Sequence, residues 1–379
     1  MDAGQFGGRD SSAGGRPKKV AGERDKGRRS RDVMTAVGRI RLTRMYVTDR
    51  DGGRFPGDDV VGVDGYLSVG AQQMATLAGL QQSFAKAEQL LHVLSGWELD
   101  DETIRRLTHS SATAAAQQRS ERKDVERFAT AAGVLEVPID AGKVNTLDGW
   151  RDVKMAVFSK REMGSPATPT DYAERELPKP TIRTVIADIV EVEKFSERVR
   201  QEADRLHVTT APDITVLADG AEWIWNLADD VFPQAAGVLD FYHAVEHIAT
   251  ATKAIWGEGT PTAIAQLDAG RTALVSNGKV GWERWLAEAM THVPAGVSTD
   301  PLLHLAAYLA KHPTRLNYAS RLAAGRTIGS GQVEGAIKQL VNLRLKRTGA
   351  RWRADHVGPL VELIALSSTP QWNQHWTAM

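Results

Sequence analysis

The sequence predicts an α/β protein in which a mixed sheet is interrupted by an all-α segment and preceded by a small β module and a helical region. Three observations predict this class. From residue 133 onward, short apolar runs alternate with longer stretches of helical periodicity. Residues 257–320 have helical periodicity and no strand signal, and residues 67–132 turn helical after an alternating apolar and basic stretch.

Composition excludes several classes of protein. The 379 residues include 47 Lys and Arg, 47 Asp and Glu, and no cysteine. Disulfide frameworks, thiolate nucleophiles and cysteine-ligated zinc or iron–sulfur sites are therefore excluded. No run approaches the ~18 apolar residues of a membrane span, and the start of the chain lacks a secretory pattern. We expect a cytoplasmic protein of two or three domains without membrane contact.

The first two segments differ in their apolar content. We expect residues 1–35 to be a disordered basic tail, because residues 1–30 hold eight basic residues, four acids and few large apolar groups. Such a tail can also contact DNA phosphates. Residues 36–66 are expected to form a small β module. Apolar and basic residues alternate over residues 37–46, which predicts a strand with a positive, solvated face, and residues 49–53 predict a tight turn.

Residues 67–132 are expected to form a helical DNA-binding region. Apolar residues recur at three- and four-residue spacing over residues 84–94, Gly96 interrupts the run, and Asp100 or Asp101 can cap a second helix. Two short helices joined by a glycine-containing turn are typical of a helix-turn-helix. The outward residues of the second helix are predicted to contact DNA: Arg105, Arg106 and His109.

The remaining chain predicts a mixed sheet with an insertion. Residues 133–256 and 321–366 are expected to form one catalytic domain, and residues 257–320 an all-α insertion within it. Strands are expected at residues 134–140, 153–158, 214–217 and 236–239, and helices at residues 184–207 and 241–256.

Two aspartates follow apolar strands. Asp140 and Asp219 are expected at the carboxyl ends of their strands, where α/β proteins bind ligands. The small residues that follow each would let a bulky substrate approach the backbone. A single aspartate of this kind is often a turn former or a helix cap, whereas a pair suggests a site.

A third acid lies in a basic segment. Between residues 321 and 353 there are eight Lys or Arg and one acid, Glu334. Glu334 could simply relieve positive charge, or it could join the two aspartates. Three carboxylates suit hard cations such as magnesium, and two such ions can activate an attacking oxygen and stabilise a leaving one. The basic side chains predicted to hold DNA are Lys338, Arg344, Lys346, Arg347 and Arg351.

Four motifs, in this order, resemble the DDE transposases of bacterial insertion sequences, in their mutator-like branch. They are VPIDAGKVNTLDGWRDVKMAVFS around Asp140, ITVLADGAEWIW around Asp219, FPQAAGVLDFYHAVEHI around Asp240 and His243, and TIGSGQVEGAIKQLVNLRLKRTGARW around Glu334. The resemblance covers roughly residues 36–366. It implies an RNase H-like catalytic core interrupted by a helical insert.

The resemblance also implies functional roles. Asp140, Asp219 and Glu334 would be catalytic and would hold two Mg²⁺ or Mn²⁺ ions. Asp240 and His243 match an acid-x-x-His pattern near the site, where His243 could position the glutamate or a phosphate, or could be bonded structurally to the core. The protein would bind the ends of its element and target DNA, as a homo-oligomer on DNA associated with the nucleoid.

Two features leave alternatives open. Relatives carry a zinc knuckle with two cysteines where this chain has Thr48 and Asp51, so no zinc is expected and the β module must be held by packing alone or be weakened. The residues His243 to His247 also spell H-x-x-E-H, the inverted zinc-peptidase pattern. A zinc metallopeptidase and a catalytically inactive DNA-binding regulator derived from a transposase are the alternative functions.

Overall fold

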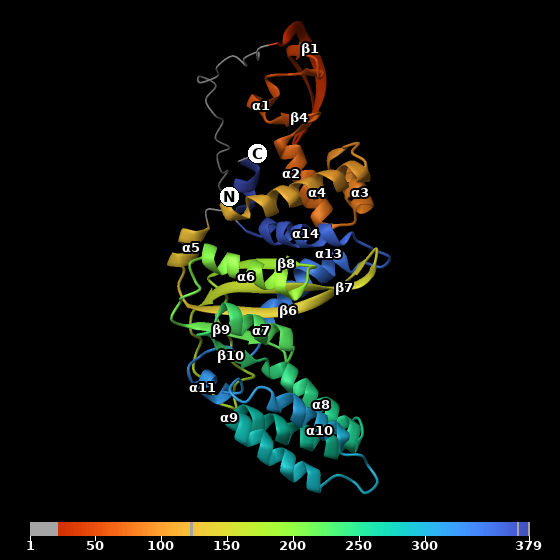
Figure 1. The fold of residues 1–379 in the computed structure, drawn as a ribbon. Coiled ribbons are helices and arrows are strands. Elements are labelled where there is room, and N and C mark those ends of the chain that lie inside the picture. The colour runs from red at the N-terminus through yellow and green to blue at the C-terminus, as the bar shows by residue number, and fades with distance from the viewer. Residues whose placement is uncertain (1–21, 122–123, 370, 378–379) are drawn as a thin grey trace. The chain divides into compact units, whose positions relative to one another are not determined.

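The computed structural model describes residues 22–121, 124–369 and 371–377 (Figure 1). The chain divides into two compact units, which are taken separately below. Unit 1 comprises Met1–Ser111 and Leu366–Met379, and unit 2 comprises Ala112–Ala365. None of the described helices is both long and apolar enough to span a membrane.

Unit 1 begins with a five-stranded sheet in the order β3-β2-β1-β5-β4. Its elements are β1 (Arg24–Thr35), β2 (Gly38–Thr48), β3 (Gly53–Arg54), α1 (Asp58–Val61), β4 (Val63–Asp64) and β5 (Leu67–Ser68). The strand expected over residues 37–46 is β2. β1 and β2 form a long antiparallel ribbon, while β5 pairs with β1 only at Met34.

The expectation of a disordered tail over residues 1–35 is wrong for residues 24–35, which form β1. Pairing with β2 satisfies the backbone hydrogen bonds of this segment, and Val33 and Met34 bury its apolar end. The charged side chains stay in water, so the strand forms without a desolvation cost. Residues 1–21 lie outside the described residues.

The turn that resembles a zinc knuckle is closed by hydrogen bonds. Asp49 N–H donates to the Gly52 carbonyl at 2.9 Å, and the Asp49 carboxylate accepts from the amides of Asp51 and Gly52. Packing is not the only support of the module. Arg54 Nε donates to Glu23 Oε1 at 2.6 Å, and Arg44 pairs with Asp58. Ion pairs therefore add to the buried Val33 and Val47.

Five described helices complete unit 1, and two of them, α4 and α14, extend into unit 2. They are α2 (Val69–Gln81), α3 (Phe84–Ser95), α4 (Asp101–Gln117) and α15 (Gln371–Thr377), with α14 (Ala354–Ser367) ending at the unit boundary. Gly96 ends α3 in a left-handed conformation, and Asp100 caps α4 by accepting the Thr103 amide at 2.8 Å. Both signals were predicted. Trp97, Leu99 and Ile104 join α2 and α3 in one buried cluster.

Unit 2 is built on a second five-stranded sheet in the order β10-β9-β6-β7-β8. Its strands are β6 (Val134–Thr146), β7 (Gly149–Arg161), β8 (Ile182–Asp188), β9 (Ile214–Ala218) and β10 (Ala236–Leu239). β6, β7 and β8 form an antiparallel meander, whereas β9 and β10 run parallel to β6. The mixed sheet expected from the sequence is confirmed.

The helix expected over residues 184–207 is wrong in its first part. Residues 182–188 form β8, and α6 (Val192–Arg205) begins after a short turn. The β-branched residues Thr184, Val185 and Ile186 favour a strand, and the neighbouring β7 supplies its partners. The other helices before the insertion are a 3₁₀ turn (Gln118–Glu121), α5 (Val125–Thr130), α7 (Glu222–Val231) and α8 (Phe241–Trp256).

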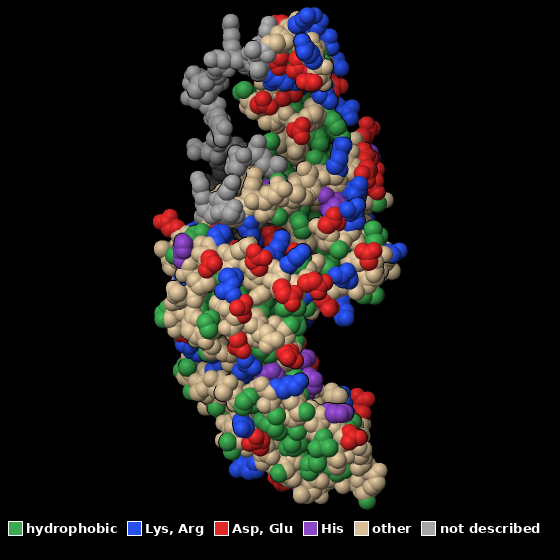
Figure 2. Space-filling view, in the orientation of Figure 1, with side chains coloured by type: hydrophobic (Ala, Val, Ile, Leu, Met, Phe, Trp, Pro, Cys, Tyr) green, Lys and Arg blue, Asp and Glu red, His purple; other side chains and the backbone are tan. Residues whose placement is uncertain are grey.

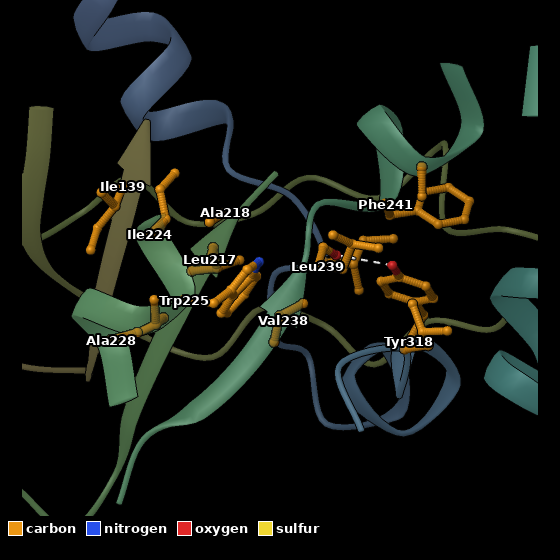
Figure 3. Packing of buried hydrophobic residues seen from close by; sticks show 14 of the residues in the cluster. Ile139, Leu217, Ala218, Ile224, Trp225, Ala228, Val238, Leu239, Phe241 and Tyr318 are labelled. Carbon is orange, nitrogen blue, oxygen red and sulfur yellow. Dashed lines mark hydrogen bonds between the residues drawn. The ribbon is translucent and has the colours of Figure 1, made fainter. Parts of the chain in front are cut away.

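The segment over residues 257–320 is helical, as predicted, with no strand in it. It contains α9 (Pro261–Thr291), which is interrupted at Gly278, α10 (Asp300–Ala310) and the start of α11 (Tyr318–Ala323). Its apolar side chains belong to the same buried cluster as the sheet. Figure 3 shows one junction of this cluster, where Tyr318 Oη donates to the Leu239 carbonyl at 2.9 Å. The insertion is therefore packed onto the sheet domain.

Candidate active site

The register of β6 and β9 places two acids side by side. These parallel strands pair from Leu135 with Ile214 to Pro138 with Leu217. Asp140 and Asp219 each lie two residues beyond the last pair. Because side chains alternate between the two faces of a sheet, both acids lie on the same face of neighbouring strands.

Asp140 is not at the end of its strand, which corrects the prediction. β9 ends at Ala218, but β6 continues to Thr146 because β7 still pairs with it, Asp140 facing Met155. The small residues after the two acids also differ from expectation. A Cβ on Gly142 would lie 2.9 Å from Ile337, and one on Gly220 would lie 2.1 Å from the Tyr308 ring. These glycines therefore admit the protein's own side chains.

Asp140 is partly buried and carries a perturbed charge. Its Oδ1 accepts the Ala141 amide at 2.6 Å. Burial, together with the nearby charges of Asp219 and Glu334, raises the pKa of Asp140 to about 6, while the Ala141 amide and His243 act in the opposite direction. Three acids from three separate elements, and one histidine, thus share one electrostatic environment.

Asp219 begins the turn from β9 into α7. Its Oδ1 accepts the Ala221 amide at 2.9 Å, and its backbone carbonyl accepts from Trp225 Nε1 at 2.9 Å. Tyr308 of α10 packs on the adjacent Gly220, and the charge of Asp219 adds to burial in raising the Tyr308 pKa. The helical insertion thus contacts the turn that holds the second acid.

Asp240 connects three segments of the site. It directly follows β10, is 1% exposed, and caps α8 by accepting the His243 amide at 2.9 Å. Its other oxygen accepts both the amide and the hydroxyl of Ser330, which precedes α12 (Gly331–Ala336). Asp240 therefore fixes the segment that leads to Glu334, and its oxygens are occupied by protein donors.

Glu334 lies on α12 with its side chain exposed. Gln332 donates to the buried Glu136 of β6, which anchors the helix over the strand. Burial raises the pKa of Glu136, and Arg161 opposes the rise at 3.1 Å. The helix continues as a π-helical segment (Ile337–Asn342) and α13 (Leu343–Leu345). Along α12 and these two segments the large buried apolar residues are Val333, Ile337, Leu340, Val341 and Leu345.

His243 and His247 lie on the same face of α8, with their Nε2 atoms 3.3 Å apart. Tyr308 stacks on His247 at 4.0 Å between ring centroids, and burial lowers the pKa of His247. His247 was predicted only as part of the alternative H-x-x-E-H pattern, and Tyr308 was not predicted as a site residue. The sequence does not distinguish Tyr308 from a core residue, because a tyrosine at helical spacing among leucines is typical of a core position.

The donor set decides which metals the site could take. Asp140, Asp219 and Glu334 offer only carboxylate oxygens, which suit hard divalent cations. Among the described residues, however, no three His, Cys, Asp or Glu side chains are already gathered as metal ligands. Glu334 is exposed, so its side chain can reorient. The H-x-x-E-H residues offer two nitrogens, while Glu246 is 77% exposed and its Oε2 lies 3.5 Å from His243 Nδ1.

The basic segment after Glu334 has exposed and buried members. Lys338, Lys346 and Arg351 are exposed, and Arg351 donates to the Leu147 carbonyl at 2.7 Å. Arg344 is only 4% exposed and lies 4.8 Å from the Trp352 ring centroid. Burial and the charge of Arg347 lower the Arg344 pKa to about 10. Arg347 is half-buried. The buried guanidinium of Arg344 shows that this residue also has a structural role.

The predicted recognition residues lie on α4. Arg106 is exposed, whereas Arg105 Nε donates to Glu102 at 2.7 Å. The His109 ring packs edge-on against Phe84, with 5.8 Å between centroids. DNA contact by Arg105, Arg106 and His109 stays a prediction.

Comparisons with known proteins give little further information. No protein-family model matches the chain, and no curated protein matches it. Among solved structures, a Drosophila P element transposase strand transfer complex is similar over 84% of this chain and 83% of that chain, with 11% sequence identity and a TM-score of 0.29.

Proposed function

We propose that unit 2 is an RNase H-like catalytic domain and that the protein is a DDE transposase of an insertion sequence. The strand order supports the first part, because an antiparallel β6–β7–β8 meander is extended by β9 and β10 parallel to β6. The acids support the second part. Asp140, Asp219 and Glu334 come from the sheet and from a helix that follows a helical insertion, in the arrangement that the sequence resemblance implies.

One observation carries the proposal. The charges of Asp219 and Glu334 both raise the pKa of Asp140, although 79 and 194 residues separate them from it in the chain. Proteins rarely hold like charges close together without a compensating partner, since the arrangement costs stability. A site that takes up divalent cations supplies that partner.

The three acids would hold two Mg²⁺ or Mn²⁺ ions, which would activate an oxygen nucleophile and stabilise the leaving oxygen of a phosphodiester. The residues of this chain organise the site before any ion enters it. Asp240 and Ser330 fix the start of α12 and so the position of Glu334. With a pKa of about 6, Asp140 holds a proton in about a tenth of the metal-free molecules at pH 7. No zinc is required by this scheme.

The proposed partner is DNA, at the element ends and at the target. The protein would bind both as a homo-oligomer on the nucleoid in the cytoplasm. The exposed Lys338, Lys346 and Arg351 lie in the same segment as Glu334 and would hold phosphates beside the acids. In-line attack by the freed 3′-hydroxyl would then join the element end to the target.

The test incubates the purified full-length protein with DNA flanking its gene, in Mg²⁺ or Mn²⁺, and resolves nicked and joined products on a gel. Wild type should yield both products. Glu334→Ala should fold, bind DNA and give no product, because the acids act as a unit. Glu193→Ala is the matched control, since it removes an exposed glutamate of α6 that lies outside the triad.

The outcomes separate the alternatives. Parental strand transfer by Glu334→Ala would refute the DDE mechanism. DNA binding without product from wild type would favour the inactive regulator. Zinc-dependent peptide cleavage that is lost in Glu246→Ala would favour the metallopeptidase, whose general base that glutamate would be.

A further inference from the structure

The β1–β2 ribbon of unit 1 carries an unusual density of positive charge. Residues 24–48 contain eight Lys or Arg and two Asp. Lys and Arg side chains gather over β1 in the space-filling view (Figure 2). The cations are Arg24, Lys26, Arg28, Arg29 and Arg31 on β1, and Arg39, Arg41 and Arg44 on β2.

The three β2 cations are neutralised and the five β1 cations are not. Each of the β2 arginines pairs with an acid: Arg39 with Glu98, Arg41 with Asp32, and Arg44 with Asp58. Within the described part of the chain, none of the five β1 cations forms a salt bridge. Arg29 instead lies over the Tyr46 ring, 4.3 Å from its centroid.

The geometry of β1 presents these cations outward. Every residue from Arg24 to Asp32 is exposed, and successive side chains point to opposite faces of the strand. β5 pairs with β1 only at Met34, so in the described structure the outer edge of the strand is open before that residue. The β1–β2 pairing shifts register between Asp25 and Arg28. Such bulges redirect side chains and increase local twist.

We propose that the β1–β2 ribbon binds double-stranded DNA through its phosphates, as a contact separate from the predicted recognition helix α4. Five cations on one strand, without a salt bridge among the described residues, can each approach a phosphate of a duplex, whose backbone carries one negative charge per about 1.7 Å of helix axis. A two-stranded ribbon also fits the major groove, which is about 12 Å wide. The proposal identifies a second contact with the DNA partner of the proposed function, but it does not depend on the catalytic chemistry.

An anionic membrane is the other polyanion that could attract the ribbon. Membrane-surface segments combine cations with apolar side chains that enter the lipid interface. The stretch from Arg24 to Asp32, which carries the five cations, contains no large apolar residue, and the exposed Val37 and Ile40 lie at the other end of the ribbon. DNA phosphates require only the cations, so the composition favours DNA.

The experiment measures binding of the full-length protein to a fluorescein-labelled 30-base-pair duplex by anisotropy, between 50 and 300 mM salt, values chosen about the physiological range. The test variant is Arg28→Gln/Arg29→Gln/Arg31→Gln. Loss of three phosphate contacts should reduce the slope of log K against log salt by about 2 to 3, and lower affinity on the order of a hundredfold at 0.15 M.

Two matched variants control for folding and net charge. Lysine replacements at positions 28, 29 and 31 keep the charge and should bind like wild type. The triple variant Arg183→Gln/Lys194→Gln/Arg284→Gln removes three exposed cations of unit 2 and should keep the parental slope. An equal loss in this variant would mean that net charge alone drives binding, and would overturn the proposal.

Two further results would overturn it. If the glutamine variant keeps its DNA affinity and instead self-associates, the β1 cations serve to prevent the open edge of the strand from pairing with another molecule. Binding of wild type to phosphatidylserine vesicles but not to the duplex would assign the ribbon to membranes. Because Glu334→Ala should keep the ribbon-dependent binding, failure of the catalytic proposal remains distinguishable from failure of this one.

Discussion

The perturbed charge of Asp140 predicts a pH-dependent effect on stability. Burial and two neighbouring acids raise its pKa from 3.8 to about 6 in the folded protein. The ionised form is therefore disfavoured by folding. The penalty is absent well below the unfolded pKa of 3.8, where the carboxyl is protonated in both states, and it is complete well above the folded pKa of about 6. Stability contributed by the protonated form is lost as pH rises through the folded pKa.

Asp140→Asn should remove this penalty from the metal-free protein. Asparagine keeps the oxygen that accepts the Ala141 amide but carries no charge. A rise from 3.8 to about 6 corresponds to at most about 3 kcal/mol at pH 7.5 and about 1 kcal/mol at pH 4.5. For a domain the size of unit 2, the larger gain raises Tm by roughly 6–10 °C.

The assay is urea and thermal unfolding in EDTA at both pH values. Asp148→Asn is the matched control, because Asp148 is exposed on the turn between β6 and β7 and should give no gain. Equal stabilisation by Asp140→Asn at both pH values, or none at pH 7.5, would refute the electrostatic reasoning. Under the proposed function, Mg²⁺ should stabilise wild type and have little effect on Asp140→Asn.

Three other predictions test the supports of the site and the recognition helix. Gly220→Ala should lower Tm, because its methyl would lie 2.1 Å from the Tyr308 ring. In a Tyr308→Ala background the same substitution should lower Tm by less. Additive effects of the two substitutions in the double variant would contradict this contact. Asp240→Ala should lower the free energy of unfolding in urea by about 2–4 kcal/mol, because the buried amides of His243 and Ser330 lose their acceptor. A decrease below about 1 kcal/mol would show that Asp240 does not hold these segments together. Arg106→Ala should weaken DNA-end binding and base preference, because each Arg–guanine pair is worth about 1–3 kcal/mol. The effect should exceed that of Arg105→Ala, since the Arg105 side chain already pairs with Glu102. If neither variant changes binding, α4 is not the recognition helix.

Local sequence signals predicted much of the architecture. The apolar run at residues 236–239 is β10, and the helical stretch at residues 241–256 is α8. Asp100 caps α4 as its side-chain chemistry requires. These features depend on neighbours in the chain, so a pattern over a few residues is sufficient to find them.

Features that depend on distant partners were missed. β8 was assigned to a helix because only pairing with β7 decides its state. Asp140 was placed at a strand end because nothing nearby indicates that β7 extends the pairing to Thr146. The contact of Tyr308 with the turn at Gly220 joins residues 88 positions apart, and no local pattern encodes it.

The order of the three acids along the chain has a consequence for synthesis in the cell. The ribosome makes Asp140 and Asp219 first, then the whole helical insertion, and only then Glu334. At about 5–20 residues per second, the 115 positions from Asp219 to Glu334 take roughly ten seconds. During that interval the growing chain already contains the residues of the ribbon and of α4 but lacks the third acid. Under the proposed function, a nascent molecule has its ribbon before it has the complete set of acids, so synthesis order separates DNA binding from cleavage.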